Sequence, residues 1–161
     1  MVTHPIPPLF SSSSRVLILG SFPSVRSREE GFFYAHRMNR FWKVISTILN
    51  RDTPETIEEK KDLILSSNLA LWDVIASCEI TGSSDSSIRS VEANDLRSVL
   101  DNSKIEVIFT NGRKAYELYC RYIEPIIGRK AVLLPSTSPA NAATSLSDLI
   151  DIWGCEIRKY L

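Results

Sequence analysis

The sequence predicts an α/β fold, a three-layer α/β/α sandwich around a short central, mainly parallel four-stranded sheet. Short apolar runs end at glycine, proline or Asn-Gly, which is typical of strands buried on both faces. Segments with apolar residues at helical spacing lie between these runs, and such alternation indicates a parallel sheet covered by helices. The length of 161 residues fits a single domain over residues 1–161, and no repeat or second domain is visible.

Three apolar runs are the clearest strands: residues 16–19 before Gly20, residues 107–109 before Asn111-Gly112, and residues 131–134 before Pro135. Residues 69–75 are a fourth candidate. Residues 1–14 contain three prolines and a run of four serines, so we expect a leading arm or loop there.

Helices are predicted where apolar residues recur on one helical face, over residues 41–49, 54–66, 115–122 and 145–160. Thr53 followed by Pro54 indicates a cap and a first-turn proline at the start of the second helix. Ser145 with Asp148 three residues later indicates the start of the last helix.

Composition excludes several classes of protein. Nineteen basic residues balance nineteen acidic ones, so the net charge does not indicate a nucleic-acid partner. A local basic face would still be enough for phosphate contacts. Three widely spaced cysteines and two histidines argue against a zinc or iron–sulfur site, and we expect no cofactor and no metal. The sequence shows no membrane span and no signal peptide, so a cytoplasmic protein with reduced thiols is expected.

Ligands of such sheets bind beyond the carboxyl ends of the strands, which here are the loops 20–40, 110–113 and 135–142. The first loop is rich in arginine and in aromatic residues that can stack on a flat base. Composition alone favours a core role for Phe32, Phe33 and Phe41, and Trp42 is expected in the core. Asn39 has an amide that can hold a water or contact a base edge.

Three segments resemble the uracil-DNA glycosylase superfamily. Gly20-Ser21-Phe22-Pro23 stands where that superfamily has a Gly-x-(Asp or Asn)-Pro turn. The run Tyr34-Ala35-His36-Arg37-Met38-Asn39-Arg40-Phe41-Trp42 is similar to the F-A-x-x-x-N-R-F-W segment of the mismatch-specific branch. Leu134-Pro135-Ser136-Thr137-Ser138-Pro139-Ala140-Asn141 is similar to the loop that enters the DNA helix. The resemblance extends from Arg15 to Leu161.

Phe22 departs from the superfamily pattern, because most members have Asp or Asn there to activate or orient water. This departure, together with Asn39 and the segment 136–141, resembles the hypoxanthine-DNA (deoxyinosine) glycosylase branch. The resemblance implies that Asn39 is the catalytic residue and that deaminated adenine is the target, with little or no activity on uracil. The strand-exit loops contain no lysine that could form the imine intermediate of a lyase, so we expect a monofunctional N-glycosyl hydrolase.

The resemblance also gives roles to other loop residues. The expected base-binding residues are Ser21, Phe22, Tyr34 and Asn111. The expected DNA-binding residues are Arg37, Arg40, Ser136, Thr137, Ser138, Pro139 and Ala140. The hydroxyls suit phosphate contacts, and Pro139-Ala140 suits a wedge into the gap that a flipped base leaves. Tyr34 is equally compatible with a half-buried loop position, Asn111 with a plain Asn-Gly turn, and the loop 135–142 with a surface cap of the last helix.

Asp73 and Asp85 are the carboxylates available as a general base, although a hydrogen-bonded strand end and a capped turn explain them as well. His36 is compatible with a contact to DNA and with packing beneath the loop, and the sequence does not distinguish the two roles. The sequence thus predicts a hydrolase that removes a deaminated base from damaged DNA, with no membrane partner, as a monomer. A uracil or mismatch glycosylase of the same fold and a non-catalytic nucleic-acid-binding module are the alternatives.

Overall fold

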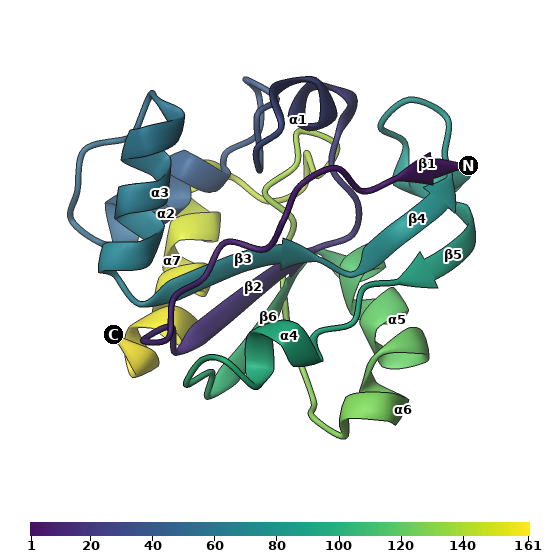
Figure 1. Ribbon diagram of the computed structural model, residues 1–161. Helices are drawn as coiled ribbons and strands as arrows, with labels where there is room; N and C mark the ends of the chain where they lie inside the picture. Colours follow the sequence, from purple (N-terminus) through teal and green to yellow (C-terminus); the bar gives the residue numbers. More distant parts are fainter.

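The computed structural model describes residues 1–161 and has a four-stranded sheet at its centre, in the order β3-β2-β6-β7 (Figure 1). The strands are β2 (Val16–Gly20), β3 (Leu69–Asp73), β6 (Val107–Asn111) and β7 (Val132–Leu134). Every pair is parallel, with Gly20 opposite Asp73 at the end of β2 and β3. The predicted sheet is therefore confirmed, and the fourth candidate segment is a strand that ends at Asp73.

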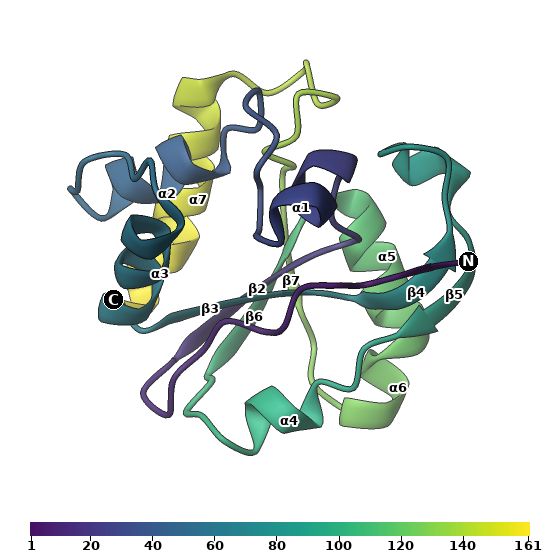
Figure 2. The ribbon, with the colours of Figure 1, turned by 45° about the horizontal axis from the view of Figure 1, so that its top comes forward.

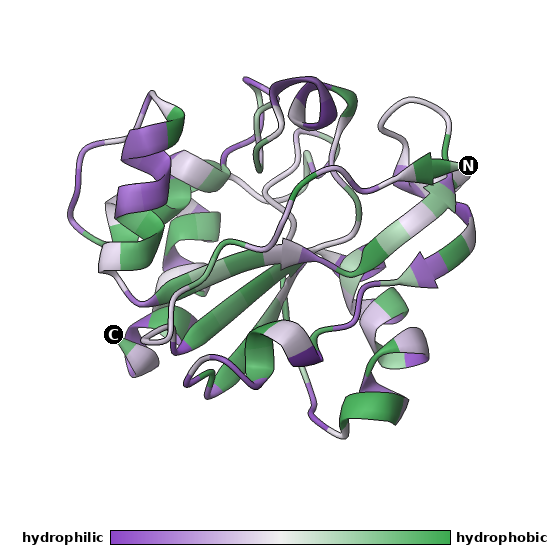
Figure 3. Cartoon of the chain, viewed as in Figure 1, coloured by the Kyte–Doolittle hydropathy of each residue, from purple (hydrophilic) through white to green (hydrophobic).

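Strand β2 explains the three layers. Val16 and Ile18 point into one apolar cluster, whereas Leu17 and Leu19 point into the other, and all four are buried. Burying each such side chain stabilises the fold by about 1.5–3 kcal/mol. Because both faces are covered, the strand is apolar throughout and shows no alternation (Figure 3).

Helices cover the two faces in separate groups (Figures 1 and 2). One face packs against α2 (Phe41–Ile48), α3 (Ile57–Ser66) and α7 (Leu146–Ile157). The other face packs against α4 (Arg97–Leu100), α5 (Arg113–Tyr122) and α6 (Glu124–Ile127). A short 3₁₀ turn, η2 (Arg158–Tyr160), ends the chain. None of the helices is long and apolar enough to cross a membrane.

Helix starts follow the local capping chemistry. Ser145 caps α7 by accepting a hydrogen bond from the Asp148 N–H, as predicted. The predicted start of α3 at Thr53-Pro54 is wrong. Thr56 is the cap and accepts from the Glu59 N–H, while the Thr53 hydroxyl bonds the Ser46 hydroxyl on α2.

A second, smaller sheet was not predicted. It is antiparallel, in the order β1-β4-β5, and consists of β1 (Val2–Thr3), β4 (Ile75–Glu79) and β5 (Arg89–Ala93). The chain enters β4 directly from β3, so one apolar stretch serves two sheets. Helix α1 (Val25–Glu30) lies in the loop after β2, and a 3₁₀ turn, η1 (Asp85–Ser87), lies between β4 and β5.

The leading arm packs against the body of the protein. Its strand β1 pairs with β4, and Leu9 forms a bridge with Leu71 of β3. Ile6 is buried in the core. The arm therefore lies along the edge of the central sheet and brings His4 to the end of β3.

Candidate active site

A pocket of about 270 Å³ opens at the carboxyl ends of the central strands. All three predicted loops contribute to it, because parallel strands deliver their following residues to the same edge of the sheet. The end of β3 and the turn before η1 complete the wall. The lining residues are Gly20, Ser21, Phe22, Pro23, Ser24, Ser27, Phe33, Tyr34, His36, Asn39, Asp73, Ser83, Asp85, Asn111, Ser136, Thr137, Ser138, Pro139 and Ala140.

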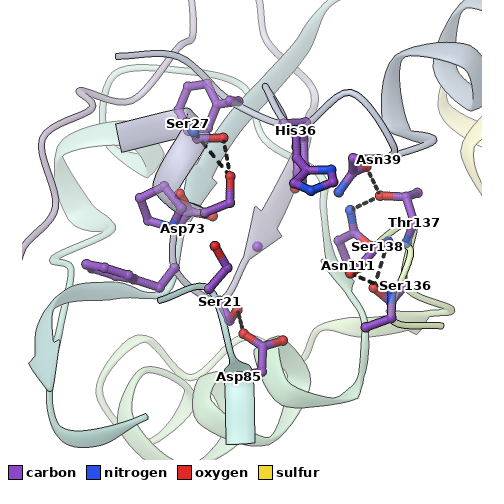
Figure 4. Close-up of a pocket in the computed structure, with 18 of the residues that line it drawn as sticks. Ser21, Ser27, His36, Asn39, Asp73, Asp85, Asn111, Ser136, Thr137 and Ser138 are labelled. Atoms are coloured by element: carbon purple, nitrogen blue, oxygen red, sulfur yellow. Dashed lines mark hydrogen bonds between the residues drawn. The ribbon is translucent and has the colours of Figure 1, made fainter. Parts of the chain in front are cut away.

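One wall is a chain of hydrogen bonds from Asn39 through Thr137 to Asn111 (Figure 4). The Thr137 hydroxyl donates to Asn39 Oδ1 over 2.8 Å and accepts from Asn111 Nδ2 over 3.0 Å. The Thr137 backbone N–H donates to Asn111 Oδ1 over 3.0 Å. We expected Thr137 on the DNA-facing surface, but its side chain is fully buried and joins the two asparagines.

These bonds fix the orientation of the Asn39 amide. Its Oδ1 accepts from the Thr137 hydroxyl and from the Phe41 N–H at the start of α2, over 2.9 Å. A backbone N–H needs an acceptor, so the oxygen must lie on this side. The Nδ2 group makes no hydrogen bond within the protein and lies at the pocket. Asn39 therefore offers a donor, and no acceptor, to a ligand.

Arg40 follows Asn39 and faces the protein instead of solvent. Its guanidinium donates to the carbonyl oxygens of Ser138, Asn141 and Thr144 over 2.6–3.1 Å. Its backbone N–H donates to the Thr137 carbonyl. Arg40 thus holds the loop 136–144 in place, in contrast to the phosphate contact that we expected. Arg37, by comparison, is exposed and makes no hydrogen bond or ion pair within the protein.

The loop after β7 presents its tip to solvent. Pro139 and Ala140 are exposed, as a wedge requires. The hydroxyls of Ser136 and Ser138 accept backbone N–H groups within the loop, which leaves each O–H free to donate outward. Gly112, with φ of 98°, lets the end of β6 pack against this loop, because a Cβ there would lie 3.0 Å from the Ser136 Cβ.

Tyr34 contributes one ring to the pocket. It stacks on Phe41 with a centroid distance of 4.0 Å, and its backbone is left-handed with φ of 52°. Its hydroxyl is buried without a hydrogen-bond partner. Burial, and then the negative charge of Asp73, raise the pKa of the Tyr34 hydroxyl well above its usual range, so it stays neutral. Phe32, Phe33, Phe41 and Trp42 are all buried, which supports the core reading for them.

The opposite wall carries the carboxylates (Figure 4). The Ser21 hydroxyl donates to Asp85 Oδ1 over 2.8 Å. Desolvation of the carboxyl raises the pKa of Asp85, and the hydrogen bond from Ser21 opposes this shift. Asp73 is 4% exposed, and its Oδ2 accepts from His4 Nε2 over 2.7 Å.

His4 is a pocket-supporting residue that the sequence did not reveal. Its ring lies edge-on to Phe22, with a centroid distance of 5.9 Å, and Phe22 in turn lines the pocket. The separation of 69 residues between His4 and Asp73 gave no local signal. His36, which was singled out, lies at the pocket with Nδ1 accepting the Met38 N–H.

The arrangement is suited to binding and polarising a flat, polar group. Phe22, Phe33 and Tyr34 supply aromatic surface, Asn39 supplies a donor, and Asp73 supplies an acceptor. No lysine lines the pocket, so no amine is placed for an imine intermediate.

Comparisons with known proteins agree with this geometry. The family model of the Uracil DNA glycosylase superfamily matches residues 7–153. The chain is 33% identical over 146 residues to the hypoxanthine DNA glycosylase of Methanosarcina acetivorans, covering 88% of this chain and 89% of that protein. The corresponding protein of Methanosarcina barkeri is 28% identical over 140 residues, covering 84% and 85%.

A solved structure extends the likeness to three dimensions. It is a solution NMR structure from Methanosarcina acetivorans of a protein provisionally assigned as a uracil DNA glycosylase. It superimposes with a TM-score of 0.83 at 29% identity, covering 99% of this chain and 98% of that chain. On these matches, the chain belongs to the uracil DNA glycosylase superfamily.

Proposed function

We propose that this protein is a monofunctional DNA glycosylase that removes hypoxanthine from damaged DNA by hydrolysing the bond between base and sugar. The relatives named hypoxanthine DNA glycosylase support this substrate, and they match most of the chain. The observation that carries the proposal is the free Nδ2 group of Asn39, which the Thr137 and Phe41 hydrogen bonds aim into the pocket. We further propose that the protein acts inside the cell. We also propose that it acts as a monomer, because base flipping needs one compact face against DNA.

The free donor suits the chemistry of base release. Water adds hydroxide to C1′ of the sugar, the C1′–N9 bonding pair leaves with hypoxanthine, and the remaining proton of water ends on the base. Negative charge therefore develops on the leaving base. A preorganised donor that contacts this charge typically contributes about 10²–10³ in rate. Asn39 is proposed to supply it, since its Oδ1 is already occupied and cannot accept a proton from water.

The remaining site residues receive roles that agree with their exposure. Tyr34 and Phe22 are proposed to contact the flipped base, with Ser21 at the pocket wall beside them. Pro139 and Ala140 are proposed to enter the gap in the stack, and Arg37, Ser136 and Ser138 to contact phosphates. Asn111, Thr137 and Arg40 are proposed to position these groups, because their polar atoms are engaged within the protein.

The test is base release from duplexes that carry a single hypoxanthine, uracil or xanthine, measured at enzyme excess and followed by alkaline strand cleavage. Asn39→Asp is the informative variant, because a carboxylate keeps the acceptor for Phe41 and Thr137 but has no donor. We expect its rate on hypoxanthine to fall about 100-fold or more. Asn102→Asp is the matched control, because Asn102 is exposed just after α4 and does not line the pocket.

Three outcomes separate the hypotheses. Release of hypoxanthine that Asn39→Asp abolishes supports the proposal. Release of uracil in preference to hypoxanthine would place the protein among the uracil glycosylases. No release from any duplex, with DNA binding intact, would make it a binding module.

A further inference from the structure

The carboxyl end of β3 carries a hydrogen-bond acceptor, the Asp73 carboxylate, which lines the pocket and has no role in the proposed reaction. Asp73 is 4% exposed and lines the pocket. Its Oδ2 is bonded to His4, whereas its Oδ1 accepts no hydrogen bond from the protein. The carboxylate also lies close under Gly20, where an added Cβ would overlap Oδ1.

This carboxylate is held rigidly. The Ile6 N–H donates to His4 Nδ1 over 3.1 Å, so the imidazole carries its proton on Nε2 and donates it to Asp73. The Asn94 side-chain amide donates to the Asp73 carbonyl and so fixes the backbone. Asp85, the other carboxylate of the pocket, lies in a short turn, and its Oδ1 already accepts the hydrogen bond from the Ser21 hydroxyl. Asp73 is thus the preorganised acceptor of the site.

A fixed carboxylate distinguishes a deaminated base from its parent. Hypoxanthine has an N–H at N1 beside a carbonyl, whereas adenine has an unprotonated N1 beside an amino group. A carboxylate accepts from the first and repels the lone pair of the second. The same change separates uracil from cytosine at N3. Among the side chains that line the pocket, Asn39 offers a donor, and the Oδ1 of the buried Asp73 offers an acceptor without a partner. Together they match a base that carries both a carbonyl and an N–H.

We propose that Asp73 accepts the ring N–H that deamination creates, and that His4, delivered by the leading arm, positions Asp73 for this contact. Asp73 is then the residue that determines base specificity, and His4 is a positioning residue. The proposal rests on the proposed glycosylase function, and it makes the leading arm part of the site although the arm lies outside the three strand-exit loops.

Two features of the surroundings support this placement. Asp73, Tyr34 and Asp85 line the same pocket, and the negative charge of Asp73 raises the pKa of both the Tyr34 hydroxyl and the Asp85 carboxyl. Tyr34 presents its hydroxyl 3.2 Å from the point that a Gly20 Cβ would occupy, so the same floor of the pocket is kept free of side-chain atoms from β2. A side chain at position 20 would therefore displace the Asp73 carboxylate from its place at the pocket.

The experiment compares single-turnover rates on duplexes that carry hypoxanthine, adenine, or purine without a 6-substituent, which lacks both the carbonyl and the N1–H. A site built to bond a donor rejects the analogue without it by about 10⁴-fold. Asp73→Asn can donate to N1 of adenine, so we expect the preference for hypoxanthine over adenine and over purine to fall about 100-fold. The ratio does not depend on the fraction of folded enzyme. Asp151→Asn, exposed on α7, is the matched control.

His4 is tested by two variants. His4→Phe keeps the ring against Phe22 but lacks the donor, and we expect it to lower the same preference about tenfold. His4→Gln has an N–H that can reach Asp73, and we expect it to recover at least half of that loss. A purely structural His4 would lower all rates together and leave the preference unchanged, which would overturn its positioning role.

The outcomes also separate this inference from the proposed substrate. If Asp73→Asn lowers every rate by one factor, base specificity lies elsewhere, and the glycosylase proposal still stands. If the native protein prefers uracil, the proposed substrate is wrong, and the Asp73 test moves to uracil against cytosine, where the same loss of preference is expected. If the native protein releases no base, both proposals fail.

Discussion

The Thr137 hydroxyl is the single group that ties the two asparagines of the pocket together, and Thr137→Val removes it with almost no change of shape. The Thr137 side chain is fully buried, so a valine there keeps water out of the position that the hydroxyl occupied. Asn39 Oδ1 keeps the Phe41 N–H, but Asn111 Nδ2 loses its acceptor. An unsatisfied buried donor costs about 1–3 kcal/mol. We therefore expect the free energy of unfolding to fall by about 2 kcal/mol.

For a chain of this size, that loss corresponds to a decrease in Tm of about 4–8 °C. We also expect base release to slow about tenfold or more, because the Asn39 amide would no longer be held in one orientation. Urea unfolding and single-turnover assays measure the two effects. Thr47→Val is the control, since Thr47 is exposed on α2 and should change stability by less than about 0.5 kcal/mol. A Thr137→Val protein with native stability and rate would refute the bridging role.

Further predictions concern four individual side chains, Arg40, Arg37, Tyr34 and the core residue Tyr119. Arg40→Ala should lower the free energy of unfolding by about 2 kcal/mol, because three carbonyl oxygens lose their donors. The same change should make the loop 136–144 more sensitive to limited proteolysis. Arg37→Ala should instead keep native stability and reduce the salt dependence of DNA binding by about one phosphate contact. Tyr34→Phe removes an unpaired hydroxyl, so urea unfolding should show unchanged or slightly higher stability, and a clear loss would mean that the hydroxyl has a partner. Burial raises the pKa of Tyr119 from 10.0 to about 12. The neutral form is thus favoured in the folded state, and stability that is complete below pH 10 should be lost as the pH rises towards 12. Tyr119→Phe should weaken that fall in urea unfolding between pH 9 and pH 12.

The central sheet could be predicted because its signals are local. Three apolar runs end at residues that stop strands, and each becomes a strand of the sheet. The fourth candidate, residues 69–75, has no such stop and becomes β3 over Leu69–Asp73. The general rule for parallel sheets then located the pocket at three loops, all of which contribute to it. Ser145 marked the start of α7 correctly, because its capping partner Asp148 is three residues away.

The remaining features depend on contacts between distant parts of the chain. The hydroxyl of Thr137 reaches Asn39 across 98 residues, so nothing in the loop 135–142 indicated that it faces inward. Arg40 follows a catalytic candidate in an arginine-rich loop, yet its partners lie about a hundred residues later. The second sheet uses two residues of the leading arm and a stretch that continues β3 directly, and neither has a periodic pattern of its own.

Phe22 connects the departure from the superfamily pattern to the arrangement of the opposite wall. A phenylalanine cannot orient water, but here its ring packs edge-on to His4 and lies under the Arg28 guanidinium, 5.5 Å from the ring centroid. It thereby covers the imidazole that holds Asp73. An aspartate at position 22 would leave this side of the imidazole unpacked and would add a third carboxylate to a wall that already carries Asp73 and Asp85. The apolar residue at position 22 and the carboxylate at position 73 are therefore compatible as a pair, since the one shields the hydrogen bond that positions the other.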